Sequence, residues 1–127
     1  MLQTLRKKLL FTILIVWGLN TLAHKFYWYS SIWWFDMPMH FLGGYFLGLL
    51  MLLVIAYTDK QSSNREKIII TLLGVFAIGV MWEGYEYAIQ ILTGSNLANP
   101  LDSTSDLFFD MAGGTFSLIL LRRLMLK

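Results

Sequence analysis

Four long apolar segments alternate with short polar or aromatic stretches along this chain. Each is close to the ~20 residues that cross a lipid bilayer as a helix, so we expect transmembrane helices over residues 5–23, 37–57, 68–92 and 105–121. Residues 24–35 are crowded with aromatic side chains, which predicts an interfacial loop, a short amphipathic helix or a lid over a site. The predicted fold class is all-α, a single transmembrane domain over residues 1–127.

Composition agrees with a membrane protein rather than a soluble domain. The 127 residues are 57% hydrophobic and 14% charged, with mean hydropathy +0.59, whereas soluble domains have about 45–50% apolar and about 25% charged residues. The absence of cysteine excludes disulfides and thiolate metal ligands. Nucleic-acid binding is not expected, because the basic residues flank apolar segments instead of gathering on one face.

The basic residues predict how the spans are oriented. In the four-span arrangement, nine of the ten fall on one side, and Lys25 is alone on the other. The positive-inside rule then puts both termini and the loop 57–67 in the cytoplasm of a cell with an inner membrane. We also expect residues 5–23 to be a retained span, since no small-x-small cleavage site follows them. The nine are Arg6, Lys7, Lys8, Lys60, Arg65, Lys67, Arg122, Arg123 and Lys127.

Two stretches seventy positions apart share the pattern D-x3-[H/D]-x2-G-G-x-F, beginning at Asp36 and at Asp106. Residues four apart lie on the same face of a helix, so Asp36 and His40 form one polar stripe and Asp106 and Asp110 another. Adjacent glycines let membrane helices approach closely. The repeat predicts two similar helical hairpins that are parallel, related by an axis along the membrane normal.

Acidic residues show the opposite distribution from the basic ones. Six of the eight belong to the half that holds His40, and a helical rise of about 1.5 Å per residue puts the deepest of them in the outer third of the bilayer. An unpaired acid at the centre of a span costs roughly 2.5–3.5 kcal/mol. The six are Asp36, Glu83, Glu86, Asp102, Asp106 and Asp110.

Lys25 is the only permanent cation in that half, so protons, water or a bound metal ion must neutralise the cluster. Carboxylates with an imidazole suit Mg²⁺, Mn²⁺, Ca²⁺ or Zn²⁺. We expect either His40 or Glu83 to act as the general base, while Asp102 and Gln90 are secondary. Asp36, Asp102 and Asp106 have helix capping as an alternative role, and Ser103 has capping-box spacing to Asp106. The predicted metal ligands are Asp36, His40, Glu83, Glu86, Asp106 and Asp110.

These motifs resemble two families of small membrane proteins. The VanZ-like proteins combine D-x3-H-F, E-x2-Q and D-x3-N-x2-G, while the YjdF-like inner-membrane proteins show W-E-x2-E followed by D-T-x2-D-L. The resemblance implies a multi-span protein of the cell envelope, and for VanZ-like proteins a link to glycopeptide resistance. Glu86 and Asp110 depart from the VanZ-like Gln and Asn, and Ser103 from the YjdF-like Thr. Besides Ser103, the residues at the motif positions are Asp36, His40, Phe41, Trp82, Glu83, Glu86, Asp102, Asp106, Leu107, Asp110 and Gly113.

Three functions follow as hypotheses. The first is a metal-dependent hydrolase or transferase whose site faces the periplasmic or extracellular side and acts on a lipid-linked or envelope substrate. The second is a proton- or cation-coupled carrier, or a small-molecule binder, for which four spans would require a homodimer. The third is a structural membrane subunit. Membrane lipid is an expected partner in all three.

Overall fold

The computed structural model describes residues 2–58, 61–94 and 100–125, and every regular element in them is helical. The helices are α1 (Leu2–Lys25), α2 (Trp28–Ser31), α3 (Asp36–Thr58), α4 (Asn64–Thr93) and α5 (Pro100–Met125). The predicted all-α class is confirmed. Each predicted span lies inside one of the four long helices, and the aromatic segment contains the short helix α2.

Two of these helices, α3 and α4, are long and apolar enough to cross a membrane by length and composition. The outer surfaces of α4 and α1 carry apolar side chains, as expected for helices in contact with lipid. Phe76 and Met81 of α4 are exposed, as are Phe11 and Trp17 of α1, whereas the outer face of a helix in a soluble bundle is polar. That all four long helices span the membrane stays a prediction.

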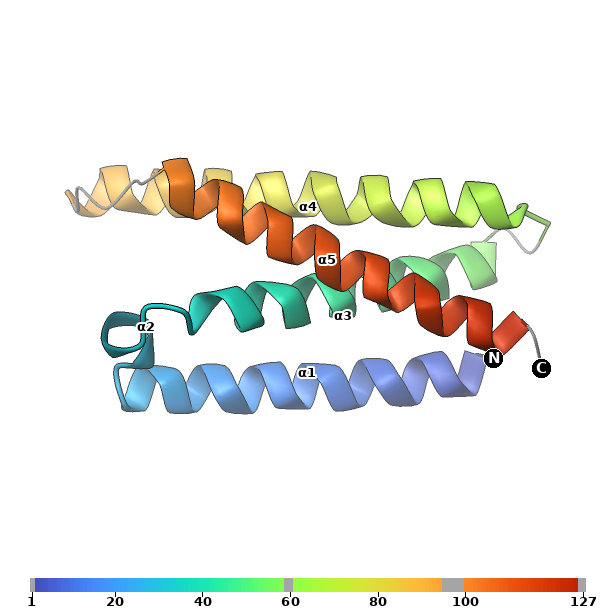
Figure 1. The fold of residues 1–127 in the computed structure, drawn as a ribbon, viewed down its shortest axis with the longest axis horizontal. Coiled ribbons are helices and arrows are strands. Elements are labelled where there is room, and N and C mark those ends of the chain that lie inside the picture. Colours follow the sequence, from blue (N-terminus) through green and yellow to red (C-terminus); the bar gives the residue numbers. More distant parts are fainter. Residues whose placement is uncertain (1, 59–60, 95–99, 126–127) are drawn as a thin grey trace.

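Helices α3 and α5 run side by side in the same direction at the centre of the molecule (Figure 1). Their backbones nearly touch where the repeated glycines fall. A Cβ on Gly44 would collide with the backbone carbonyl of Asp110, and a Cβ on Gly113 with that of Phe41. Such contacts need residues without side chains, the usual basis of close helix packing in membranes.

The other two long helices cover this central pair on opposite sides (Figure 1). Helix α1 packs on α3, and α4 packs on both α3 and α5. One apolar cluster joins the start of α1 to the later part of α3 through Leu5, Leu9, Leu49 and Leu52. Together with Phe35 and Met39, the buried Ala23 forms a second cluster that holds the other end of α1.

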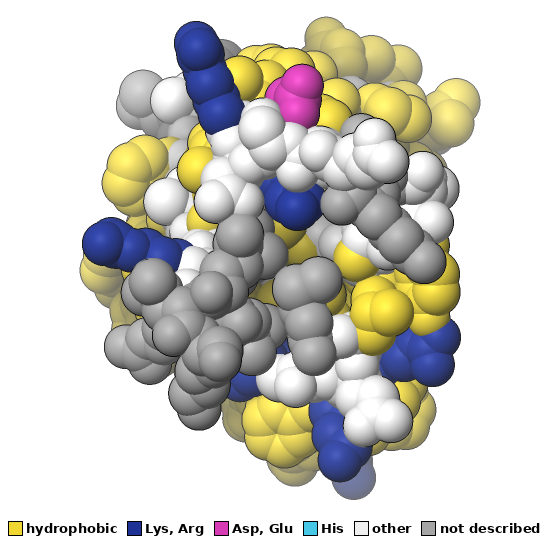
Figure 2. All heavy atoms as spheres, turned by 90° about the vertical axis from the view of Figure 1, so that its right-hand side faces the viewer, with side chains coloured by type: hydrophobic (Ala, Val, Ile, Leu, Met, Phe, Trp, Pro, Cys, Tyr) yellow, Lys and Arg dark blue, Asp and Glu magenta, His cyan; other side chains and the backbone are white. Residues whose placement is uncertain are grey.

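Opposite charges gather at opposite ends of the bundle. Both termini and the α3–α4 connection lie at one end (Figure 1), and Lys and Arg side chains spread around that face (Figure 2). The six predicted site acids lie in the first turns of α3, the first half of α5 and the second half of α4, which is the other end. Which end faces the cytoplasm stays a prediction.

All four long helices begin before the predicted spans, at residues 2, 36, 64 and 100 instead of 5, 37, 68 and 105. Helix α5 begins at Pro100, a favourable first residue because proline lacks the N–H that would otherwise be unpaired. The capping role considered for Ser103 and Asp106 is therefore wrong, because both lie inside the helix. The structure instead has a capping box at the start of α4: Ser63 Oγ accepts from the Glu66 N–H at 3.3 Å, and Glu66 Oε2 from the Ser63 N–H at 2.6 Å.

We expect Gly113→Ala to lower the free energy of unfolding by about 1–3 kcal/mol, because the new methyl group would overpack the α3–α5 contact. Gly84→Ala is the matched control, since a Cβ there meets no atom within 4 Å. Thermal and denaturant unfolding in detergent, followed by circular dichroism, measures both. Equal stabilities of the two variants would show that the helices do not touch at this point.

Candidate functional site

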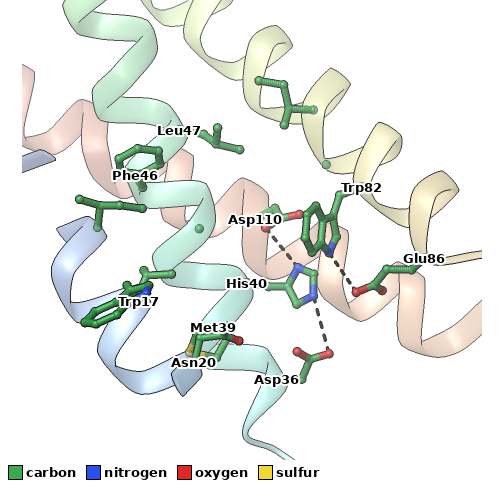
Figure 3. Close-up of a pocket in the computed structure, with 15 residues that line it drawn as sticks. Trp17, Asn20, Asp36, Met39, His40, Phe46, Leu47, Trp82, Glu86 and Asp110 are labelled. Carbon is green, nitrogen blue, oxygen red and sulfur yellow. Dashed lines mark hydrogen bonds and ion pairs between the residues drawn. The ribbon is translucent and has the colours of Figure 1, made fainter. Parts of the chain in front are cut away.

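His40 lies at the centre of the acidic cluster, in the second turn of α3, and its side chain is only 8% exposed. Its Nδ1 lies 3.3 Å from Oδ1 of Asp110 on α5, across the contact that Gly44 makes possible (Figure 3). Asp110 is itself buried. The imidazole is therefore tied to a carboxylate seventy positions away in the sequence.

The other ring nitrogen faces two further carboxylates. His40 Nε2 lies 3.6 Å from Asp36 Oδ2 and 3.7 Å from Asp106 Oδ2. Both distances are too long for a hydrogen bond. Asp106 is buried, whereas Asp36 is partly exposed. The structure thus brings Asp36, His40, Asp106 and Asp110 together.

This arrangement limits the proton states of His40. If Nδ1 donates to Asp110, the Nε2 of a neutral ring presents a lone pair toward two oxygen acceptors. That contact is unfavourable unless Nε2 also carries a proton or a cation lies between the three groups. One atom each from Asp36, His40 and Asp106 lie within 4.8 Å of one another, so the same three side chains could hold a metal ion.

Glu86 on α4 borders the cluster without touching His40. Its Oε1 accepts a hydrogen bond from Trp82 Nε1 at 3.0 Å (Figure 3). Because Trp82 and Glu86 are four residues apart, they share a face of α4 that points toward His40. Glu86 therefore contributes negative charge close to the site and a carboxylate with one oxygen left for another partner.

The remaining predicted residues lie farther out. Glu83 is partly buried, and its Oε1 is shielded from solvent without a hydrogen-bond partner among the described residues. Oε1 of Gln90 is also shielded from solvent without a hydrogen-bond partner among the described residues. Asp102 is exposed in the first turn of α5. Among the described residues, none of these three forms a hydrogen bond or ion pair with His40, although the Glu83 charge still acts on Asp106 and Glu86.

A cavity of about 470 Å³ opens beside the cluster. Asp36, His40, Glu86 and Asp110 form its polar part, and the remaining wall is mostly apolar. Helix α1 contributes Ile13, Val16, Trp17 and Asn20 to this wall, which the sequence did not suggest.

Asn20 is the feature of the sequence that could have indicated that α1 lines the cavity, because it is a polar amide within an apolar segment. Its Oδ1 accepts from the Tyr29 hydroxyl at 2.9 Å. Burial, followed by the charges of Asp36 and Glu86, raises the pKa of Tyr29, so the hydroxyl keeps its proton and remains a donor. Through this bond, α2 is tied to the cavity end of α1.

Comparison with known proteins identifies the family. A profile described as "Predicted membrane protein (DUF2238)" matches residues 3–127. The chain belongs to this family. It is therefore a helical membrane protein, as the apolar outer faces of α1 and α4 indicate. No curated protein and no solved structure matches the chain.

We expect the substitutions His40→Ala and Asp110→Ala to be coupled by about 0.5–3 kcal/mol in a double-mutant cycle, because their side chains are in contact. The control cycle pairs His40→Ala with Glu66→Ala, at the opposite end of the bundle, and should be additive within about 0.5 kcal/mol. Unfolding free energies in detergent measure both cycles. Additivity in the first cycle would mean that the two side chains do not interact.

Proposed function

We propose that this protein binds one divalent cation at Asp36, His40 and Asp106 and acts on a lipid-linked or envelope substrate at the outer face of an inner membrane. The observation that carries the proposal is that the two ring nitrogens of His40 face different carboxylates. Asp110 holds one ring nitrogen, while the other faces two carboxylates at distances too long for hydrogen bonds. Histidine ligands of metals are usually oriented in this way, by a carboxylate on the ring nitrogen away from the ion.

The spacing of the three side chains supports a cation of ordinary size. Ligand atoms about 2.1 Å from a tetrahedral zinc ion lie about 3.4 Å apart, close to the 3.6 and 3.7 Å found around Nε2. Two oxygens and one nitrogen also suit Mn²⁺, and Ca²⁺ or Mg²⁺ with more oxygen ligands. Three protein ligands leave a coordination position for water or substrate, as in catalytic metal sites.

Charge balance supports the same proposal. No lysine or arginine occurs in residues 26–59 or 68–121, so His40 is the one cationic group that these parts of α3, α4 and α5 can supply. A divalent ion would offset the repulsion among the buried carboxylates without a basic side chain. It would also reduce the cost of holding acids in a membrane span.

The chemistry proposed for such an ion is polarisation of a phosphoryl or ester group, or activation of water. With His40 as a ligand, the general base would be a carboxylate of α4. Glu86 borders the cavity and is the better placed of the two, and Glu83 lies one turn earlier. The resemblance to VanZ-like and YjdF-like proteins supports a role in the cell envelope, with the basic end of the bundle in the cytoplasm.

A carrier is the second candidate, and one observation favours it. The repeated motifs place α3 and α5 in parallel, with equivalent positions His40 and Asp110 in contact, which is the kind of internal symmetry found in transporters. The expected result for a coupled carrier is that Glu83→Gln abolishes proton- or cation-driven flux in proteoliposomes. Flux that this variant leaves unchanged would remove the carrier hypothesis.

We expect one divalent ion per chain to co-purify with the protein. Asp110→Asn should weaken its binding about 10–100-fold, as loss of a partner that orients a ligand does. Asp36→Ala and Asp106→Ala should abolish binding, while Asp102→Asn, on an exposed residue, should leave it unchanged. Elemental analysis after dialysis, followed by titration calorimetry with Zn²⁺, Mn²⁺, Mg²⁺ and Ca²⁺, measures these effects. Protein that holds no stoichiometric ion and binds none would overturn the proposal.

A further inference from the structure

The cavity beside His40 lies between α1 and α4 and has α3 as its floor. Its walls are Ile13 and Val16 of α1, Phe46 and Leu47 of α3, and Ile78 of α4. Helix α1 packs on α3, whereas α4 packs on α3 and α5, and α1 and α4 share no extensive contact. The gap between them therefore leaves the cavity open toward the surroundings of the bundle.

The chemistry of the cavity changes along α3. Asp36 and His40 form one end, and Phe46 and Leu47, about two turns further along, belong to the apolar part (Figure 3). A compartment that is polar at one end and apolar along its length suits an amphiphile. Its volume of about 470 Å³ falls within the range of about 300–1,000 Å³ found for ligand pockets.

The position of the polar end indicates how an amphiphile would enter. It adjoins α2 and the aromatic segment, where Trp33 and Trp34 are exposed, and exposed tryptophans mark the level of lipid headgroups. The apolar part extends along α3, which is apolar enough to cross the membrane. The headgroup and chain of a membrane lipid would thus meet surfaces of matching polarity without leaving the bilayer.

We propose that this cavity binds one phosphorylated membrane lipid, with a hydrocarbon chain between α1 and α4 and the phosphate as the remaining ligand of the cation at Asp36, His40 and Asp106. This inference rests on the proposed function, because the acidic cluster without a cation would repel a phosphate. The apolar walls favour a lipid over free phosphate, for which they offer no partner. The lipid would thereby be the substrate class of the site.

The test uses a phospholipid that carries a photoactivatable group on its acyl chain, in vesicles that contain the full chain. Gly43→Leu would fill the cavity, since Gly43 lines it and a Cβ there meets Asp110 Oδ1 only at 3.9 Å. Ile78→Trp fills it from α4 and serves as a second variant. Gly84→Leu is the control, because a Cβ at Gly84 meets no atom within 4 Å.

We expect labelled peptides from the cavity-lining parts of α1, α3 and α4. Labelling should fall about tenfold in both filled variants, because each displaces several methylene groups of the chain, and should be unchanged in Gly84→Leu. Unlabelled phospholipid should compete, and diacylglycerol, which lacks the phosphate, should compete poorly. Labelling that both filled variants leave unchanged, or equal competition by diacylglycerol, would overturn the inference.

Chelation separates this inference from the proposed function. Removal of the cation with EDTA should reduce labelling, because the phosphate would lose its partner. Protein that holds a stoichiometric cation but shows no cavity-specific labelling overturns the lipid inference alone. Specific labelling of a protein that holds no divalent ion overturns the cation and, with it, the phosphate contact.

Discussion

The contact between the backbones of α3 and α5 determines the rest of this structure. Gly44 and Gly113 allow it, because a side chain at either position would collide with a carbonyl of the opposite helix. The same closeness brings His40 within 3.3 Å of Asp110. If the helices were farther apart, the imidazole and the carboxylate would each lose a hydrogen-bond partner. No lysine or arginine could replace it, because none occurs in residues 26–59 or 68–121.

The repeated motif gives this contact its chemical character. Equivalent positions of the two copies meet, and at the central one His40 stands opposite Asp110. Two ionised aspartates there would repel each other, and so would two protonated histidines. The difference between the copies thus provides a complementary pair, while the first aspartates of both copies, Asp36 and Asp106, lie near the second ring nitrogen.

Much of this arrangement was predictable from local patterns. Long apolar segments predicted the four long helices, and the i,i+4 stripes correctly placed Asp36 with His40 and Asp106 with Asp110. That Glu86 lines the cavity and Glu83 does not was not predictable, because only tertiary packing decides which face of α4 turns toward His40. The helix α5 begins at Pro100, before the predicted span at 105, because proline is as typical of a loop as of the first residue of a helix. The S-x-x-E signature at Ser63 marks the start of α4 inside a hydrophilic stretch that by itself predicts only a loop.

The order of the helices along the chain affects how the protein is made. His40 belongs to α3, yet its partner Asp110 belongs to α5, which is synthesised only after α4. During that interval the imidazole and Asp36 have no α5 carboxylate beside them. The buried cluster is therefore complete only once α5 has packed against α3, and until then the polar groups of α3 lack the partners that the folded protein gives them.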